Sequence, residues 1–261
     1  MKFIRQILIP VLIVTSAVAA VASGSAIRGI FTPARPAAAA RPNITFPVYD
    51  AGADSLFHEL AALYNRIGEL KAYLAEGTIR VTDQGDSSRN TDLRFRYCHK
   101  DSMDYYQLGD QEMLAVPGLY LSVNHTLKKI MMSPRPQAGQ FKLLINEEQL
   151  SELKKEGYDI TKENADPFTV IRLKREKHVS CREYRVTYDS TGFIRGIFMR
   201  NANEAVPEDF SKDRLISVQI NPWRTEYLPA QLFRVNRYIV KNGDSWMPAS
   251  AFRNYEIKYI Y

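Results

Sequence analysis

Histidines and cysteines are the side chains of this chain best suited to metal binding. His58, His99, His125 and His178 are the only histidines, and none has the HxH or HExxH spacing of metal-binding pairs. No CxxC pair occurs either. His99 and Asp101 lie two residues apart beside a predicted strand end, but a metal site needs three or four converging ligands. The spacing therefore predicts no metal and no cofactor.

Motifs for nucleophilic catalysis and phosphate binding are missing as well. The chain contains no GxSxG sequence, no Walker loop and no GxGxxG loop. The paired carboxylates Glu147 and Glu148 lie at the start of a predicted helix, where the helix dipole favours negative charge. We therefore expect a protein that is not an enzyme.

The most regular pattern is an alternation of apolar and polar side chains, which is typical of strands with one dry and one wet face. In a curved sheet, such dry faces can line a hollow that holds an apolar ligand. A closed and filled core is the alternative interpretation. The candidate lining residues, three from each of four predicted strands, are Leu93, Phe95, Tyr97, Leu119, Leu121, Val123, Tyr184, Val186, Tyr188, Ile216, Val218 and Ile220.

Two predicted helices accompany the strands. Residues 54–67 (DSLFHELAALYNRI) carry apolar side chains at helical spacing, and Gly68 can end the helix. Residues 146–157 (NEEQLSELKKEG) begin with a capping asparagine and acids and end with lysines and glycine. This second segment predicts a short helix.

Short strands separated by turn residues make up the rest of the predicted domain. The expected fold is mainly β, of the α+β class: a curved antiparallel half-barrel of about 11 strands with two helices on its concave side. The predicted strands cover residues 76–82, 90–99, 104–108, 112–116, 119–123, 127–132, 168–175, 179–188, 193–201, 215–221, 231–240 and 251–261.

The amino-terminal region is typical of an exported protein. Lys2 and Arg5 precede an apolar run, and residues 1–26 are predicted to be a signal peptide or a membrane anchor. Cleavage after Ala22 and retention of residues 7–27 as one span are both open. Residues 27–49 are a Pro/Ala linker, and residues 50–261 are a single predicted domain.

Net charge excludes one class of partner. The chain carries +6, but five basic residues and no acidic ones lie before residue 50. From residue 50 onward, 30 basic residues face 29 acidic ones. Because a nucleic-acid-binding domain needs a positive excess on its own surface, we expect no nucleic-acid partner.

Cys98 and Cys181 are the only cysteines. An oxidising envelope compartment would permit a disulfide bond between them. Two free thiols that behave as small apolar residues are the alternative, and the sequence does not separate the two.

Four segments of the domain resemble the LolA/LolB-like superfamily of periplasmic lipoprotein carriers and outer-membrane lipoprotein receptors. They are residues 77–81 (GTIRV), 93–97 (LRFRY), 106–114 (YQLGDQEML) and 188–194 (YDSTGFI). The resemblance implies a half-barrel with a cavity for lipid chains. The linker before the domain is unlike a free shuttle, and no residue here matches the basic residue that locks the family's cavity.

Two functions follow as expectations. The first is an envelope binding protein that holds a lipid acyl chain or a lipidated protein in a half-barrel cavity, in the periplasm. The second is a membrane-anchored, non-catalytic structural component of an envelope assembly, fixed in the inner membrane. Its partners would be envelope membrane proteins, whereas a lipid or lipidated protein is the partner in the first.

Overall fold

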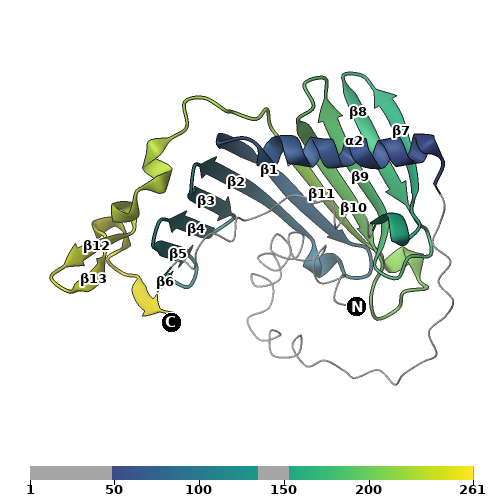
Figure 1. The fold of residues 1–261 in the computed structure, drawn as a ribbon. Coiled ribbons are helices and arrows are strands. Elements are labelled where there is room, and N and C mark those ends of the chain that lie inside the picture. Colours follow the sequence, from purple (N-terminus) through teal and green to yellow (C-terminus); the bar gives the residue numbers. More distant parts are fainter. Residues whose placement is uncertain (1–48, 135–152, 261) are drawn as a thin grey trace.

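A single 12-stranded sheet dominates the computed structural model, which describes residues 49–134 and 153–260 (Figure 1). The strand order is β14-β6-β5-β4-β3-β2-β1-β11-β10-β9-β8-β7. The sheet curves without closing on itself, which confirms the expected half-barrel. A separate two-stranded sheet, β12-β13, lies at one end.

The first half of the large sheet is a meander of hairpins. Gly109 and Gly118 have φ of 55° and 77°, a left-handed conformation that favours glycine, in two of its tight turns. A 3-10 turn, η2 (Ser87–Arg89), joins the first two strands. The strands are β1 (Ala72–Asp83), β2 (Thr91–Lys100), β3 (Met103–Leu108), β4 (Gln111–Val116), β5 (Leu119–Asn124) and β6 (Lys129–Ser133).

The second half begins at the opposite edge and returns to the centre. Its last strand pairs antiparallel with β1, from Gly77 opposite Ile220 to Asp83 opposite Arg214. Its first strand is polar and exposed along most of its length and was missed by the apolar pattern. The elements are β7 (Asp159–Ala165), β8 (Phe168–Lys174), β9 (Cys181–Asp189), β10 (Ile194–Asn201), η3 (Phe210–Lys212) and β11 (Arg214–Ile220).

Helix α2 (Ala51–Gly68) confirms the first predicted helix and lies across the concave side of the sheet (Figure 1). The carboxylate of Asp50 caps it by accepting a 2.7 Å hydrogen bond from the backbone N–H of Ala53. Its buried residues are Phe57, Leu60, Ala61, Leu63, Tyr64 and Ile67. Of the second predicted helix, residues 153–155 are helical, and residues 146–152 lie outside the described residues.

Residues 222–260, here named the C-terminal block, depart most from the sequence-based prediction. Residues 231–240 were predicted as a strand but form mainly 3-10 turns, because adjacent residues such as Leu232 and Phe233 are both buried. Two neighbours in a strand cannot face the same side. The elements are η4 (Ala230–Phe233), η5 (Val235–Arg237), β12 (Ile239–Asn242), β13 (Ser245–Pro248), η6 (Ser250–Phe252) and β14 (Glu256–Tyr259).

One pairing breaks the antiparallel pattern. Strand β14 pairs parallel with β6 and so covers that edge of the sheet. The backbone N–H of Glu256 donates to the carbonyl oxygen of Lys128 at 2.9 Å, which places the start of β14 beside the β5–β6 turn.

The sheet has two differently covered faces, set by the period-2 alternation of its strands. Tyr97 of β2 lies on the face that packs against α2, here named the inner face. Its neighbour Cys98 lies on the outer face, where the C-terminal block covers β1–β6. The hydrophobic core is therefore divided between the two sides of one sheet.

Candidate functional site

An apolar cluster on the inner face, beside α2, is the candidate site. Six adjacent strands, β3, β2, β1, β11, β10 and β9, contribute all of its members. Its buried residues are Ile79, Val81, Leu108, Met199 and Ile216, and its half-buried rim residues are Leu93, Phe95, Tyr106, Tyr184, Ile197 and Val218. We name these eleven residues the inner cluster. Among the described residues, no helix contributes to the inner cluster.

Glycine makes room for one of the aromatic rim side chains. A Cβ at Gly77 would lie 2.8 Å from Cε1 of Phe95 and 1.8 Å from the carbonyl oxygen of Gln219. The Phe95 ring thus lies directly over the β1 backbone, where any other residue would displace it. Packing on the inner face therefore explains why a glycine occupies the first position of the GTIRV segment.

Nine of the twelve predicted lining residues lie on the inner face. Ile216, Leu93, Phe95, Tyr184 and Val218 belong to the inner cluster. The remaining four pack with α2 and are Tyr97, Val186, Tyr188 and Ile220. Cross-strand register brings side chains of neighbouring strands together on this face, because Val218 of β11 lies opposite both Ile79 of β1 and Ile197 of β10.

The other three predicted lining residues do not join them. Leu119, Leu121 and Val123 of β5 lie on the outer face and pack with the C-terminal block. The register decides this, since Leu121 lies opposite Leu114, which lies opposite Tyr105 of the outer face. Alternation predicts that a strand has an apolar face but not on which side of the sheet it falls.

Within residues 49–134 and 153–260, two hydroxyl groups beside the inner cluster have no hydrogen-bond partner. The hydroxyls of Tyr106 and Thr91 are both buried and unpaired. Burial raises the pKa of Tyr106, so its hydroxyl stays protonated and able to donate. The two residues lie far apart. Tyr106 is opposite Tyr97, and Thr91 is six residues from Tyr97 along β2, or about 20 Å at roughly 3.3 Å per residue. A buried hydroxyl without a partner costs about 1–3 kcal/mol, and a bound polar group would relieve that cost.

A satisfied polar network borders the same face. The Tyr97 hydroxyl and Nδ1 of His99 both contact Oδ1 of Asp104, at 2.9 Å and 2.8 Å. The neighbouring ring of Tyr73 is buried, which raises the pKa of Tyr73 to about 12. His99 is therefore paired with Asp104 and not with Asp101.

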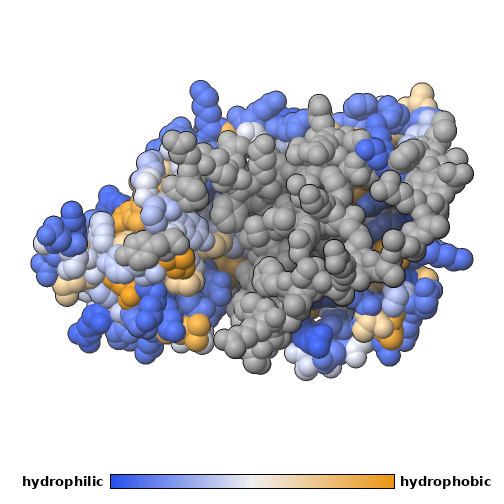
Figure 2. All heavy atoms as spheres, turned by 60° about the horizontal axis from the view of Figure 1, so that its bottom comes forward, coloured by the Kyte–Doolittle hydropathy of each residue, from blue (hydrophilic) through white to orange (hydrophobic). Residues whose placement is uncertain are grey.

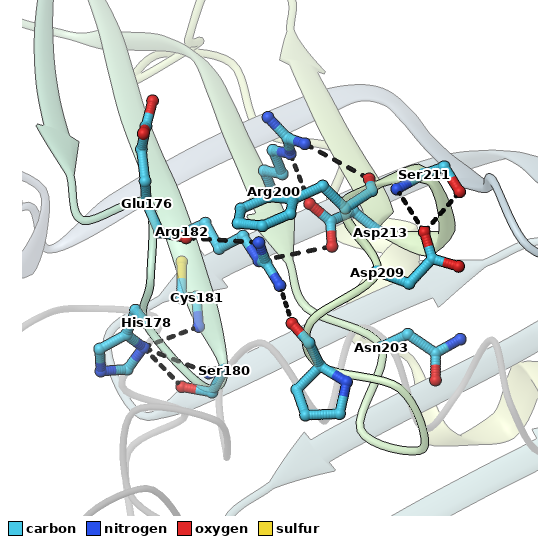
Figure 3. A network of polar contacts seen from close by, with 12 residues as sticks. Glu176, His178, Ser180, Cys181, Arg182, Arg200, Asn203, Asp209, Ser211 and Asp213 are labelled. Atoms are coloured by element: carbon cyan, nitrogen blue, oxygen red, sulfur yellow. Dashed lines mark hydrogen bonds and ion pairs between the residues drawn. The ribbon is translucent and has the colours of Figure 1, made fainter.

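A second buried network closes the end of β9, β10 and β11 (Figure 3). The carboxylate of Asp213 is fully buried, with Nε of Arg200 at 2.6 Å from Oδ2 and Nε of Arg182 at 3.4 Å from Oδ1. The Arg182 guanidinium also lies 3.6 Å from the ring centroid of Phe210 and donates to the carbonyl oxygen of Pro207. These contacts fix the loop between β10 and β11 to β9, a structural role.

The disulfide left open by the sequence does not form, because the fold separates the two cysteines. Cys98 on β2 and Cys181 on β9 are both free thiols. Strands β1, β11 and β10 lie between them, which at about 4.8 Å per strand gives about 19 Å. A disulfide needs Cα atoms within about 7 Å.

The described residues hold no group of three or more His, Cys, Asp or Glu side chains that could bind a metal ion. Over the same residues, no helix combines the length and the apolar character needed to span a bilayer.

Sequence reasoning missed six members of the inner cluster. Ile79 and Val81 were placed in a predicted strand but not chosen as lining residues, although they alternate with Arg80 in the GTIRV pattern. Tyr106 and Leu108 offered the same signal in β3. Ile197 and Met199 alternate in β10, where flanking glycine and phenylalanine hide the period.

Comparisons with known proteins find a likeness at the level of structure only. No family model matches the chain, and no curated protein matches it in sequence. A solved structure of an uncharacterized conserved protein from Thermus thermophilus has a TM-score of 0.40 at 7% identity. That match covers 80% of this chain and 99% of the other.

Two further solved structures are similar. A LolA superfamily protein from Nitrosomonas europaea has a TM-score of 0.32 at 10% identity, over 70% of this chain and 97% of its own. A DUF1329 family protein from Desulfovibrio piger has a TM-score of 0.31 at 10% identity, over 70% and 98%. The resemblance in fold expected from the sequence is thus met among solved structures, and at these TM-scores it says nothing about ligand or partner.

Proposed function

We propose that this chain is an exported, non-catalytic binding protein of the cell envelope that holds an acyl chain of a lipid, or of a lipidated protein, against the inner cluster. One observation carries the proposal. The inner cluster is a continuous apolar surface across six strands, and its rim side chains, such as Phe95 and Val218, are only half-buried. An acyl chain gains free energy by covering such a surface, at about 25 cal/mol per Å².

The polar groups around the cluster suit the rest of a lipid. Tyr106 and Thr91 offer, at separate places beside the apolar surface, hydroxyls that pair with none of the residues the structure describes. An ester or carboxyl group contains oxygen acceptors for these donors. Apolar lining with a few placed polar groups is the usual design of small-molecule sites.

Location and partners belong to the same proposal. The leader predicted at residues 1–26 would bring the domain to the periplasm or another envelope compartment. The Pro/Ala linker at residues 27–49 would separate the domain from a membrane if the leader is retained.

A matched pair of phenylalanines tests the acyl-binding role. Phe95 lies on the inner face, whereas Phe198 lies on the outer face of β10 under the guanidinium of Arg185, at 3.9 Å. With delipidated full-length protein, Phe95→Ala should weaken binding of a fluorescent fatty acid about tenfold, since part of an aromatic contact of roughly 1.5–3 kcal/mol is lost. Phe198→Ala should leave the affinity unchanged.

Two results would refute the proposal: no probe binding by the unmutated chain, or equal weakening by Phe95→Ala and Phe198→Ala. Native mass spectrometry of protein purified from the envelope provides the second measurement, with co-purified lipid mass as the expected result.

The rival function, an anchored structural component of an envelope assembly, is favoured by the long apolar run at residues 7–27. Amino-terminal sequencing of the mature protein separates the two. An intact Met1 together with no bound lipid supports the anchored component, and a new terminus near Ala22 with bound lipid supports the soluble binder.

A further inference from the structure

The C-terminal block ends in an exposed apolar pair whose role the fold does not explain. Val240 of β12 lies directly opposite Met247 of β13, and the two side chains are 41% and 47% exposed. Opposite residues of an antiparallel pair share a face, so they form one apolar spot on the solvent side of the hairpin. Tyr259, the last residue of the adjoining strand β14, and Ile260 after it are 46% and 51% exposed.

These side chains gather at one end of the molecule. Figure 2 shows apolar side chains (orange) at the end formed by β12, β13 and β14, away from α2 in Figure 1. Leu127, in the β5–β6 turn beside the start of β14, is 62% exposed and adds to the same end. Exposed apolar side chains that gather in one region of a surface can mark an interaction site.

Positive charge is concentrated in the same block. Residues 222–260 contain six basic and three acidic residues, whereas residues 50–221 contain 24 basic and 26 acidic ones. Arg253 and Lys258 of the block are exposed, as are Lys128 of the neighbouring turn and Lys129 at the start of β6. Lys241 is exposed as well, but it lies opposite Trp246, on the other side of the hairpin from Val240 and Met247. An apolar spot with basic residues around it is complementary to an anionic bilayer, where each basic residue near the surface contributes about 1 kcal/mol.

The hairpin is held rigidly enough to present this surface. Tyr238 and Ile239 at its base are 0% and 1% exposed, and Trp246 packs against the core on the side opposite Met247. The backbone N–H of Ala249 donates to the carbonyl oxygen of Tyr238 at 2.8 Å and closes the hairpin base.

We propose that the outer side of the β12–β13 hairpin, with Val240 and Met247 at its centre, is a docking surface for an anionic lipid bilayer. The hairpin inserts its apolar pair at the headgroup level, and the surrounding lysines and arginine contact the lipid phosphates. This surface lies on the opposite side of the sheet from the inner cluster, so it orients the protein on a membrane without occupying the acyl-binding site.

Tryptophan fluorescence provides the test. The chain has two tryptophans, and Trp246 lies in the hairpin while Trp223 packs with α2. In the full chain carrying Trp223→Phe, Trp246 should be quenched by vesicles of phosphatidylglycerol and acyl-brominated phosphatidylcholine. Vesicles of brominated phosphatidylcholine alone should quench it much less, and added salt should reduce the quenching. If Trp223→Phe fails to fold, loss of the quenched signal in Trp246→Phe gives the same information.

Substitutions localise the contact. Val240→Asp with Met247→Asp should weaken the quenching about tenfold or more, since an apolar insertion is replaced by two like charges facing anionic lipid. Val179→Asp is the matched control, because Val179 is 66% exposed at the far β8–β9 turn. It should leave the quenching unchanged, and none of these changes should affect fatty-acid binding at the inner cluster.

Three outcomes would overturn the proposal. They are absence of Trp246 quenching by anionic vesicles, quenching that persists in the double variant, and self-association without vesicles that the double variant abolishes. The last would make this surface a contact between two copies of the chain.

Discussion

At the residue scale, His178 links stability to pH. Its Nδ1 accepts hydrogen bonds from the backbone N–H groups of Ser180 and Cys181, at 3.2 Å and 3.1 Å, and is therefore unprotonated (Figure 3). Burial, followed by the charge of Arg175, lowers the pKa of His178 from 6.5 to about 4. The Glu156 carboxylate lies 3.5 Å from Nε2, yet burial outweighs its attraction.

A lowered histidine pKa means that the unfolded chain binds more protons between pH 6.5 and about 4. Stability from this group is complete above pH 6.5 and falls by an amount on the order of 3 kcal/mol as the pH drops through this window. We predict that His178→Asn, whose side-chain oxygen can accept the same backbone hydrogen bonds, flattens the pH dependence of Tm there. Calorimetry at pH values between 6.5 and about 4 measures this change in the pH dependence of Tm.

The control for this prediction is His58→Asn, since His58 is a surface histidine with a 71% exposed side chain. It should leave the slope of Tm against pH unchanged. A slope that is equally steep in His178→Asn and in the unmutated chain would contradict a neutral, buried His178.

At the scale of elements, Glu112 attaches the C-terminal block to the sheet. This β4 carboxylate is 5% exposed and accepts hydrogen bonds from Tyr105, His125 and Tyr238, with Arg237 at 3.2 Å. Burial alone would raise the pKa of Glu112, but the Tyr238 hydrogen bond and the Arg237 charge outweigh it and lower the pKa. Its stabilisation is therefore present above the ordinary glutamate pKa and lost as the pH falls through the lowered one.

We predict that Glu112→Gln destabilises the chain by about 3 kcal/mol, because it leaves Arg237 without its buried partner. Backbone amides of the C-terminal block should then exchange with solvent faster than those of β7–β11. Urea unfolding measures the first effect, and hydrogen exchange with mass spectrometry measures the second.

A surface carboxylate of the same block provides the comparison. Glu256 pairs with Lys258 at 2.5 Å with both side chains more than half exposed, so Glu256→Gln should leave the free energy of unfolding close to that of the unmutated chain. Similar losses in the two variants would show that Glu112 does not hold the block in place.

At the scale of the whole molecule, one pairing joins the two halves of the sheet. Strand β1 pairs with β2 on one side and with β11 on the other, although β11 lies more than a hundred residues later in the chain. Helix α2 spans this junction, packing with Tyr73 of β1 and with Val186 and Tyr188 of β9. We therefore predict that the domain at residues 50–261 unfolds as one unit.

Hydrogen exchange at low urea checks that prediction. Amides of β1 and β11 should exchange slowest, with one common free energy, while those of the edge strands β7 and β14 should exchange faster. Two separate exchange free energies, one for β1–β6 and another for β7–β11, would indicate two folding units.

Local pattern was sufficient for most of the fold. The apolar stripe of residues 54–67 identified α2, and turn residues such as Gly109 and Gly118 separated the hairpins. The local pattern failed to predict β7, whose sequence DITKENA is that of a polar edge strand. It also failed in residues 231–240, where neighbouring buried residues break the period-2 alternation. Both failures occur where an element gets its stability from what it packs against rather than from its own pattern.

The sequence by itself determined that the chain has strands with one apolar face and one long amphipathic helix, because these depend on neighbours a few residues apart. Only the tertiary structure decided which side each apolar face takes. It put Phe95 beside Val218 on the inner face and Leu121 under the C-terminal block. The reason is that a face is assigned by cross-strand register between distant segments, and register is set by the whole sheet.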